Sequence, residues 1–259
     1  LKFDYFAPNE KHRLTLYTSA QHTDRDSYYG SKKDLNAYGK TTDLTFIGGS
    51  QYVYSFDKCL FMPADLTAGL EYNRDNLKDD MWGYNRYTRQ TVNIGSAFFQ
   101  NEWKNEKWSI LLGGRLDKHN LINHVIFSPR ANLRFNPTQD VNLRLSYSSG
   151  FRAPQAFDED LHIENVGGTV SMIERAKNLK EEKSQSFSAS ADMYHRFGAF
   201  QVNFLVEGFY TKLSDVFVLE NIGVRDGILI KERRNGSGAK VLGLSMEGKM
   251  AYLSLFQLQ

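Results

Sequence analysis

The feature that most constrains this chain is a strand pattern with two different faces. Between Gln139 and Phe151 apolar residues alternate with polar ones, namely Val141, Leu143, Leu145 and Tyr147 with Asn142, Arg144, Ser146 and Ser148. The pattern recurs about ten times, and its connections alternate between tight turns and long polar loops. Alternating apolar-out and polar-in strands with this punctuation are typical of an outer-membrane β-barrel. We therefore predict an all-β fold.

Composition excludes several other classes of protein. No stretch approaches the roughly 18 consecutive apolar residues of a transmembrane helix, whereas the mean hydropathy of −0.49 fits strands with one polar face. The net charge of +2, with lysine and arginine scattered among acids, argues against a nucleic-acid partner. The single cysteine, Cys59, leaves no disulfide and no CxxC zinc signature. No G-x-S-x-G, HExxH or P-loop motif is present, so we predict neither an enzyme nor a bound cofactor.

The same pattern places the strands and their connections. We expect strands at residues 12–23, 41–57, 64–74, 88–103, 107–118, 126–136, 140–151, 182–197, 200–213 and 237–253. Short turns at 57–63, 104–106, 136–139 and 198–199 would face the periplasm. Long connections at 24–40, 75–87, 119–125, 152–181 and 214–236 would face the outside. Within the last of these we predict a hairpin that pairs Val216 to Asn221 with Gly227 to Glu232.

Side-chain alternation also predicts which face each charge occupies. A Lys or Arg that faces lipid at mid-bilayer costs roughly 2–4 kcal/mol in a barrel, so the charged residues should share the inner face. The residues that we place there are Arg115, Arg130, Arg134, Arg144 and Glu207. Aromatic residues flank the short turns, as the membrane interface favours, at Trp103, Trp108, Phe135, Phe197 and Phe200.

Three of the long connections carry candidate ligand-binding residues. Rings that could stack on a ligand, with an arginine that could pair with an anion, are Tyr28, Tyr29, Trp82, Tyr84 and Arg86. The alternative for these rings is packing within their own loops. The run Asp158, Glu159, Asp160, with His162 and Glu164, offers ligands for a divalent cation. We favour the alternative, in which this acidic segment orders its loop by pairing with Arg152 or nearby lysines, and we predict no metal site.

A series of blocks in the second half of the chain resembles a known family. The blocks are "FSPRANLRFNP", "VNLRLSYSSGFRAPQAFDEDL", "NLKEEKSQSFSASADMY", "VEGFYTKLSDVFVLENIG" and "NGSGAKVLGLSMEGKM". In order and spacing they are similar to the barrel of TonB-dependent outer-membrane receptors, mainly over residues 110–250. The resemblance implies a barrel of about 22 strands with an N-terminal plug inside it. It also implies TonB-energised uptake of a scarce, large solute, such as an iron-siderophore, a corrinoid or a similar metal chelate.

The resemblance further implies a location and partners. The location is the outer membrane of a Gram-negative bacterium, and the partners are its lipid and lipopolysaccharide, the chelate, and the TonB complex through the plug. A surface lipoprotein is a further candidate partner. On this reading the five inner-face residues named above would contact the plug. We recognise no plug or closing strands in the chain, so we expect residues 1–259 to be part of one barrel domain. A passive porin and a soluble all-β binding module or outer-membrane hydrolase remain as alternatives.

Overall fold

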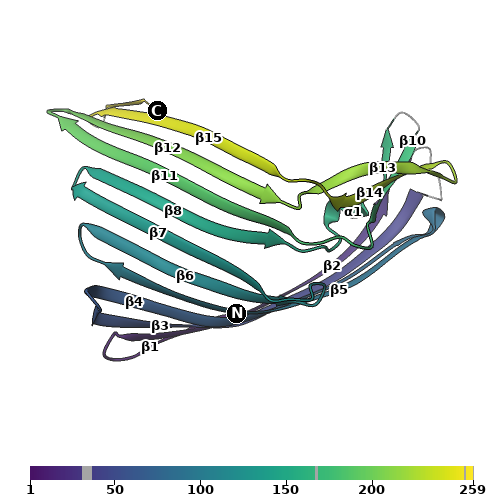
Figure 1. The fold of residues 1–259 in the computed structure, drawn as a ribbon, viewed down its shortest axis with the longest axis horizontal. Helices are drawn as coiled ribbons and strands as arrows, with labels where there is room; N and C mark the ends of the chain where they lie inside the picture. Colours follow the sequence, from purple (N-terminus) through teal and green to yellow (C-terminus); the bar gives the residue numbers. More distant parts are fainter. Residues whose placement is uncertain (31–36, 167–168, 254, 259) are drawn as a thin grey trace.

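The main body of the protein is one strongly curved antiparallel sheet of 12 strands (Figure 1). The structure is a computed structural model that describes residues 1–30, 37–166, 169–253 and 255–258. The strands follow one another in the order β1-β2-β3-β4-β5-β6-β7-β8-β11-β12-β15-β16, and the first and last do not pair with each other. Within the described residues, no helix is long and apolar enough to cross a membrane.

The strands of the large sheet differ in length, and so extend to different distances from the short turns. The large sheet consists of β1 (Lys2–Phe6), β2 (His12–Tyr28), β3 (Tyr38–Cys59), β4 (Met62–Met81), β5 (Arg86–Lys104), β6 (Trp108–His119), β7 (Ile126–Thr138), β8 (Val141–Arg152), β11 (Glu182–Phe197), β12 (Phe200–Ser214), β15 (Ala239–Tyr252) and β16 (Phe256–Leu258). The short turns all lie at one end of the sheet (Figure 1). The ten predicted strands and their short turns are confirmed, and β1 and β16 are additional.

The long loop predicted at 75–87 is wrong over most of its length, because β4 continues to Met81 and β5 begins at Arg86. The loop predicted at 24–40 is shorter at both ends, because β2 continues to Tyr28 and β3 begins at Tyr38, and residues 31–36 lie outside the described residues. Only a short 3-10 turn, η2 (Trp82–Tyr84), separates β4 from β5. The pairing of β3 with β4 runs in unbroken register from Phe56↔Ala64 to Gly39↔Met81. Ladder hydrogen bonds therefore extend these hairpins into water, where polar residues on both faces hide the strand signal.

The two faces of the large sheet carry different side chains, as predicted. Residues directly opposite one another in register share a face, so Leu112, Ala131, Tyr147 and Phe187 form one apolar row across four strands. At the short-turn end, Trp108 stacks on Phe135 with ring centroids 4.1 Å apart, and Phe61 stacks on Trp103 at 5.6 Å. The apolar face is called the outer face below, and the opposite face the inner face.

A second sheet is built from the two longest connections. Its strands, in the order β13-β14-β10-β9, are β9 (Glu164–Val166), β10 (Thr169–Arg175), β13 (Phe217–Arg225) and β14 (Ile228–Asn235). The predicted hairpin is confirmed as β13 and β14, whereas the parallel pairing of β10 with β14 was not expected. Met172 and Ile230 of this small sheet, with Ile163 from the segment before β9, pack on the inner-face residue Met81. The small sheet therefore covers the long-loop end of the inner face.

The chain re-enters the large sheet through Gly238, and we predict that this glycine is required. Its φ of +117° and a Cβ that would lie 2.6 Å from the carbonyl oxygen of Leu213 both disfavour any side chain. Gly238→Ala is expected to lower the free energy of unfolding by about 1–3 kcal/mol. The measurement is a urea titration of the folded protein. Gly248→Ala in β15, the strand that follows Gly238, is the control, because its Cβ meets nothing within 4 Å, and equal effects of the two substitutions would contradict the prediction.

Candidate functional site

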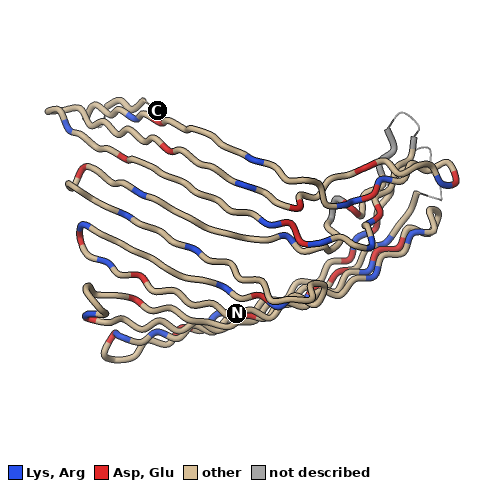
Figure 2. Tube along the Cα trace, in the orientation of Figure 1, with Lys and Arg blue, Asp and Glu red and all other residues tan. Residues whose placement is uncertain are grey.

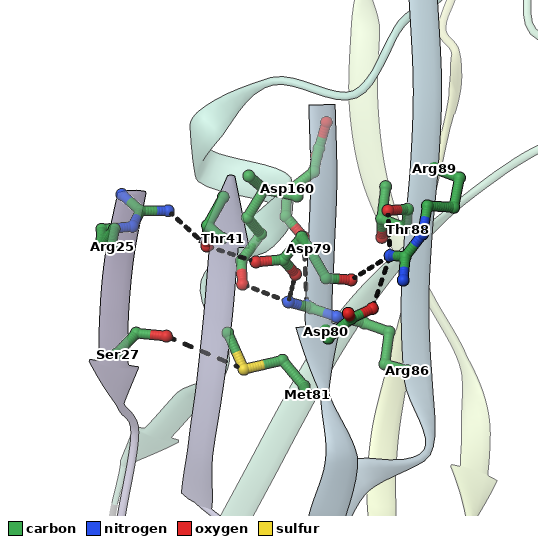
Figure 3. A network of polar contacts seen from close by, with 11 residues as sticks. Arg25, Ser27, Thr41, Asp79, Asp80, Met81, Arg86, Thr88, Arg89 and Asp160 are labelled. Carbon is green, nitrogen blue, oxygen red and sulfur yellow. Dashed lines mark hydrogen bonds and ion pairs between the residues drawn. The ribbon is translucent and has the colours of Figure 1, made fainter. Parts of the chain in front are cut away.

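The long-loop end of the inner face is held by a buried ion pair between Asp79 and Arg86 (Figure 3). The Asp79 side chain is 0% exposed, and one carboxylate oxygen lies 2.7 Å from Nη2 of Arg86. The other oxygen accepts a hydrogen bond of 2.6 Å from Oγ1 of Thr41. Arg86 also donates to the main-chain carbonyls of Asp160 and Leu161. This pair therefore joins the tips of β3, β4 and β5 to the segment after β8.

A second buried ion pair joins that segment to the small sheet. Asp160 lies in the single-turn helix α1 (Asp158–Leu161). Its Oδ1 accepts a bond of 2.8 Å from Nε of Arg233, which lies on β14, and the two side chains are 5% and 6% exposed. Since each partner neutralises the other away from water, neither can be removed without leaving a buried charge. The two pairs thus form one chain of contacts from β3 to β14.

A cavity of about 460 Å³ lies between η2, the start of β5 and the small sheet. Its wall combines rings, apolar side chains and charges: Tyr84, Tyr87, Arg89, Met172, Glu174, Arg175, Arg225, Ile228 and Ile230. Charged residues of both signs gather at this end of the molecule (Figure 2). The wall is therefore mixed, with charged groups beside apolar and aromatic side chains. A concave site with polar groups held in fixed positions can bind a small molecule.

The arginines of this cavity differ in how far their charge is neutralised. Arg89 lies 2.5 Å from Asp80, whose carboxylate raises the pKa of the guanidinium, and Arg225 pairs with Glu174 at 2.7 Å. Arg175 instead donates to neutral oxygens, at 2.8 Å to Oε1 of Gln90 and at 3.4 Å to the carbonyl of Pro154. Desolvation by the surrounding loops lowers the pKa of Arg175, although part of the side chain meets solvent and it stays a cation. Among the described residues, it has no carboxylate in ion-pair contact.

Gln90 fixes the position of Arg175. This buried side chain on β5 accepts a bond of 2.7 Å from the main-chain N–H of Ala156 and donates to the Ala156 carbonyl at 3.3 Å. The same Oε1 that receives the Ala156 N–H also receives Nη1 of Arg175. Arg175 is therefore held at the wall by a rigid strand, although it belongs to a loop-derived sheet.

The structure brings some of the sequence-predicted outer residues together and separates others. Tyr84, Arg86 and Asp160 line the cavity. Tyr29 and His162 lie ring to ring with centroids 5.7 Å apart. Tyr28 packs at 4.7 Å on Tyr38, its direct partner where β2 ends and β3 begins. Trp82 is exposed in η2, and Asp158 and Glu159 open α1. The described part of the chain holds no group of three or more His, Cys, Asp or Glu that could bind a metal ion.

The five inner-face residues lie on β6, β7, β8 and β12, outside the cavity, and differ in their pairing. Arg115 is used within the wall, because it donates at 2.8 Å to both Glu71 and Asp117 and at 2.7 Å to Oγ of Ser96. Among the residues that the structure describes, Arg130, Arg134, Arg144 and Glu207 form no ion pair. Of the five charges, that of Arg115 is therefore neutralised by carboxylates of the large sheet, and the other four have no counter-ion among the described residues.

Comparison with known proteins assigns the chain to a family. The family model described as "TonB dependent receptor-like, beta-barrel" matches residues 1–258. The siderophore receptor PirA from Acinetobacter baumannii is similar with a TM-score of 0.69 at 17% identity, over 97% of this chain and 41% of that one. The ferric enterobactin receptor PfeA from Pseudomonas aeruginosa, as a Q482A mutant with enterobactin, gives 0.68 at 18% identity, over 96% and 40%.

The Serratia marcescens hemophore receptor HasR, in complex with its hemophore HasA and heme, gives a TM-score of 0.68 at 16% identity, over 93% of this chain and 43% of that one. No curated protein matches the sequence. At these identities the similarity to solved structures shows the fold alone. The chain spans less than half the length of each of these receptors.

Proposed function

Since the chain belongs to the TonB-dependent receptor family, as part of its β-barrel, we propose that the whole protein is an outer-membrane importer. In this proposal the protein binds a large, scarce solute at its outer surface and moves it inward with energy supplied through TonB. The family is one of transport receptors and not of enzymes. No observation on the described residues favours a passive porin or a hydrolase in its place.

The solute that we propose is an anionic metal chelate of the iron-siderophore type, which binds in the cavity at the long-loop end. The observation that carries this proposal is Arg175, a cation that forms no ion pair with a carboxylate of the described residues and that Gln90 holds at the cavity wall. Tyr84 and Tyr87 supply rings on which a flat, aromatic chelating group could stack. Receptors of similar fold are described as siderophore, ferric enterobactin and hemophore receptors, which supports the same class of solute.

The two faces of the sheet fit the same proposal. The outer face, with its apolar rows and aromatic short-turn end, would contact outer-membrane lipid and lipopolysaccharide. The inner face would contact the plug through Arg115, Arg130, Arg134, Arg144 and Glu207, and TonB would act on that plug. The test is uptake of a labelled ferric chelate by cells that express the full-length protein, with and without a protonophore. Accumulation that persists without the proton gradient would overturn the proposal.

Arg175→Ala is expected to weaken binding of an anionic ferric chelate by about tenfold to a hundredfold, because a charge-assisted hydrogen bond contributes about 1.5–3 kcal/mol. The measurement is equilibrium binding to the full-length receptor in outer-membrane vesicles. Arg234→Ala is the matched control, since Arg234 lies on the small sheet but outside the cavity and pairs with Glu220 and Glu232. Equal affinities of the Arg175 variant and the control would show that the cavity is not the binding site.

A further inference from the structure

The large sheet is split between β7 and β8 at its long-loop end. In that direction, Arg130 and Ser148 are the last residues at which the two strands pair. Beyond them, among the residues that the structure describes, 126–129 of β7 pair only with β6, and 149–152 of β8 pair only with β11. Figure 1 shows the two strands separating toward this end. We call the gap between these two unpaired stretches the seam.

The residues at the seam explain why the pairing stops there. Pro129 follows the unpaired stretch directly and has no N–H to donate, so it is tolerated where a strand forms an edge. A pocket of about 220 Å³ lies at the seam and is lined from both strands, by Phe127 and Ser128 of β7 and by Ser149 and Gly150 of β8. Missing pairing and open space therefore coincide at one place in the wall.

One segment reaches across the seam. Residues 153–161 leave the end of β8 and contact β6, β5 and β4, and we call them the strap. At the end of β6, Nε2 of the buried His119 lies 3.2 Å from Oε1 of Gln155 in the strap. The main-chain N–H of Leu121 donates to Nδ1 of the same ring, so the ring proton is on Nε2. His119 therefore donates to the strap.

The strap is also held on β5 and β4. Gln90 of β5 accepts from the N–H of Ala156 at 2.7 Å and donates to its carbonyl at 3.3 Å. Leu77 of β4 forms a buried apolar cluster with Ala156 and Leu161. Because Gln90 and Ala156 are buried, separating them without water would leave polar groups unpaired at a cost. Side-chain contacts of the strap thus join the two parts of the wall where ladder hydrogen bonds do not.

Opening the seam would nevertheless break few interactions. Ala153 of the strap packs with Ile122 and Ile126, and Nε2 of His124 lies 3.1 Å from Oε1 of Glu181. The ladders on the far sides stay intact, because 126–129 remain on β6 and 149–152 remain on β11. Elements held by a few contacts, with no ladder of their own across the gap, belong to the low-stability end of a fold.

We propose that the strap is a releasable clasp on a split wall. When it is docked on His119, Gln90 and Leu77, it holds the long-loop ends of β7 and β8 together. When it is released, the seam opens and the mouth of the barrel widens within the wall itself. This inference goes beyond the proposed function and does not depend on which solute the protein binds.

The experiment measures the width of the seam in the full-length protein in lipid vesicles, without any solute. Spin labels are attached at Ser128→Cys on β7 and Ser184→Cys on β11, which both line the seam pocket, with Cys59→Ser throughout. Pulsed electron paramagnetic resonance gives the distribution of distances between the labels. The reference pair is Asn132→Cys with Ser188→Cys, which spans the same three strands where the ladder is intact.

Two variants loosen the strap to different extents. Gln155→Ala removes the bond from His119, and its combination with Gln90→Ala removes both bonds to Ala156 as well. We expect the ratio of long to short distances at the seam to rise in that order, by about tenfold or more in the double variant, because its hydrogen bonds to the strap are lost. Gln21→Ala with Gln51→Ala is the matched control, since these glutamines lie on β2 and β3, away from the seam.

The outcomes decide between a clasp and a passive loop. An unchanged seam distance in the double variant would overturn the proposal. An equal rise in the reference pair would overturn it too, because the whole wall would then be loosened. Barrel assembly is checked by heat-dependent mobility in gels, and the Gln155 variant decides alone if the double variant does not assemble. None of these measurements involves a solute or TonB, so they stand even if the proposed function fails.

Discussion

Replacing Arg86 by alanine is expected to weaken the packing of α1 and the small sheet on β3, β4 and β5. The expected cost in local stability is about 3–5 kcal/mol. The reason is that the Asp79 side chain, 0% exposed, would keep a buried negative charge, and among the described side chains it would retain the Thr41 hydroxyl as its hydrogen-bond partner. The substitution also removes the donor shared by the carbonyls of Asp160 and Leu161, so α1 loses its anchor. Because the cavity lies between these elements, chelate binding should fall together with local stability.

Hydrogen exchange of the full-length protein in lipid is the measurement for this prediction. Exchange should accelerate in α1, β10 and β14 and remain unchanged in β6 and β7. Arg89→Ala is the control, because the Arg89 side chain is 50% exposed and its ion pair with Asp80 is expected to contribute about 0–1 kcal/mol. Asp79→Asn combined with Arg86→Ala should recover part of the loss, since it removes the buried charge. Unchanged exchange in α1 of the Arg86 variant would show that the anchor lies elsewhere.

The strands of the large sheet could be predicted from the sequence because apolar and polar residues alternate along a strand that has one apolar face. The inner and outer faces of β6, β7 and β8 are predicted residue by residue for the same reason. The signal fails above the apolar band, where Asp75, Lys78 and Asp80 make both faces of β4 polar although the ladder continues to Met81. Polarity marks where a strand leaves the apolar layer, and not where the strand ends.

The candidate site is less visible in the sequence because its residues meet only through tertiary contacts. Tyr84, Arg86 and Asp160 stood out as aromatic or charged loop residues. Arg175 and Arg233 did not, since the parallel pairing of β10 with β14 joins two connections that are far apart in the chain. Asp160 was expected to pair with Arg152 or nearby lysines, but its partner is Arg233, which comes from the other connection. Nothing in the sequence marks Gln90 as a site residue, because it looks like any other polar residue of a strand.

The largest effect outside the cavity is expected at the outer face, where Leu112→Arg should impair assembly of the barrel in lipid. Leu112 is 51% exposed in the middle of the apolar rows, directly opposite Ala131 and next to Gly114 and Ile110 in the same band. An arginine at mid-bilayer on the lipid face costs roughly 2–4 kcal/mol. The fraction of assembled protein should therefore fall by about tenfold or more, as measured by heat-dependent mobility after folding into vesicles.

The neighbouring substitution Leu111→Arg provides the strictest control, because it places the same side chain on the same strand but on the inner face. Leu111 is directly opposite Glu102 on one side and Asn132 on the other, so an arginine there would meet a carboxylate and water instead of lipid. Its cost should be small, and a contact with Glu102 would reduce it further. Equal impairment by the two variants would show that both faces are equally intolerant of charge, and the lipid-facing role of the outer rows would then be wrong.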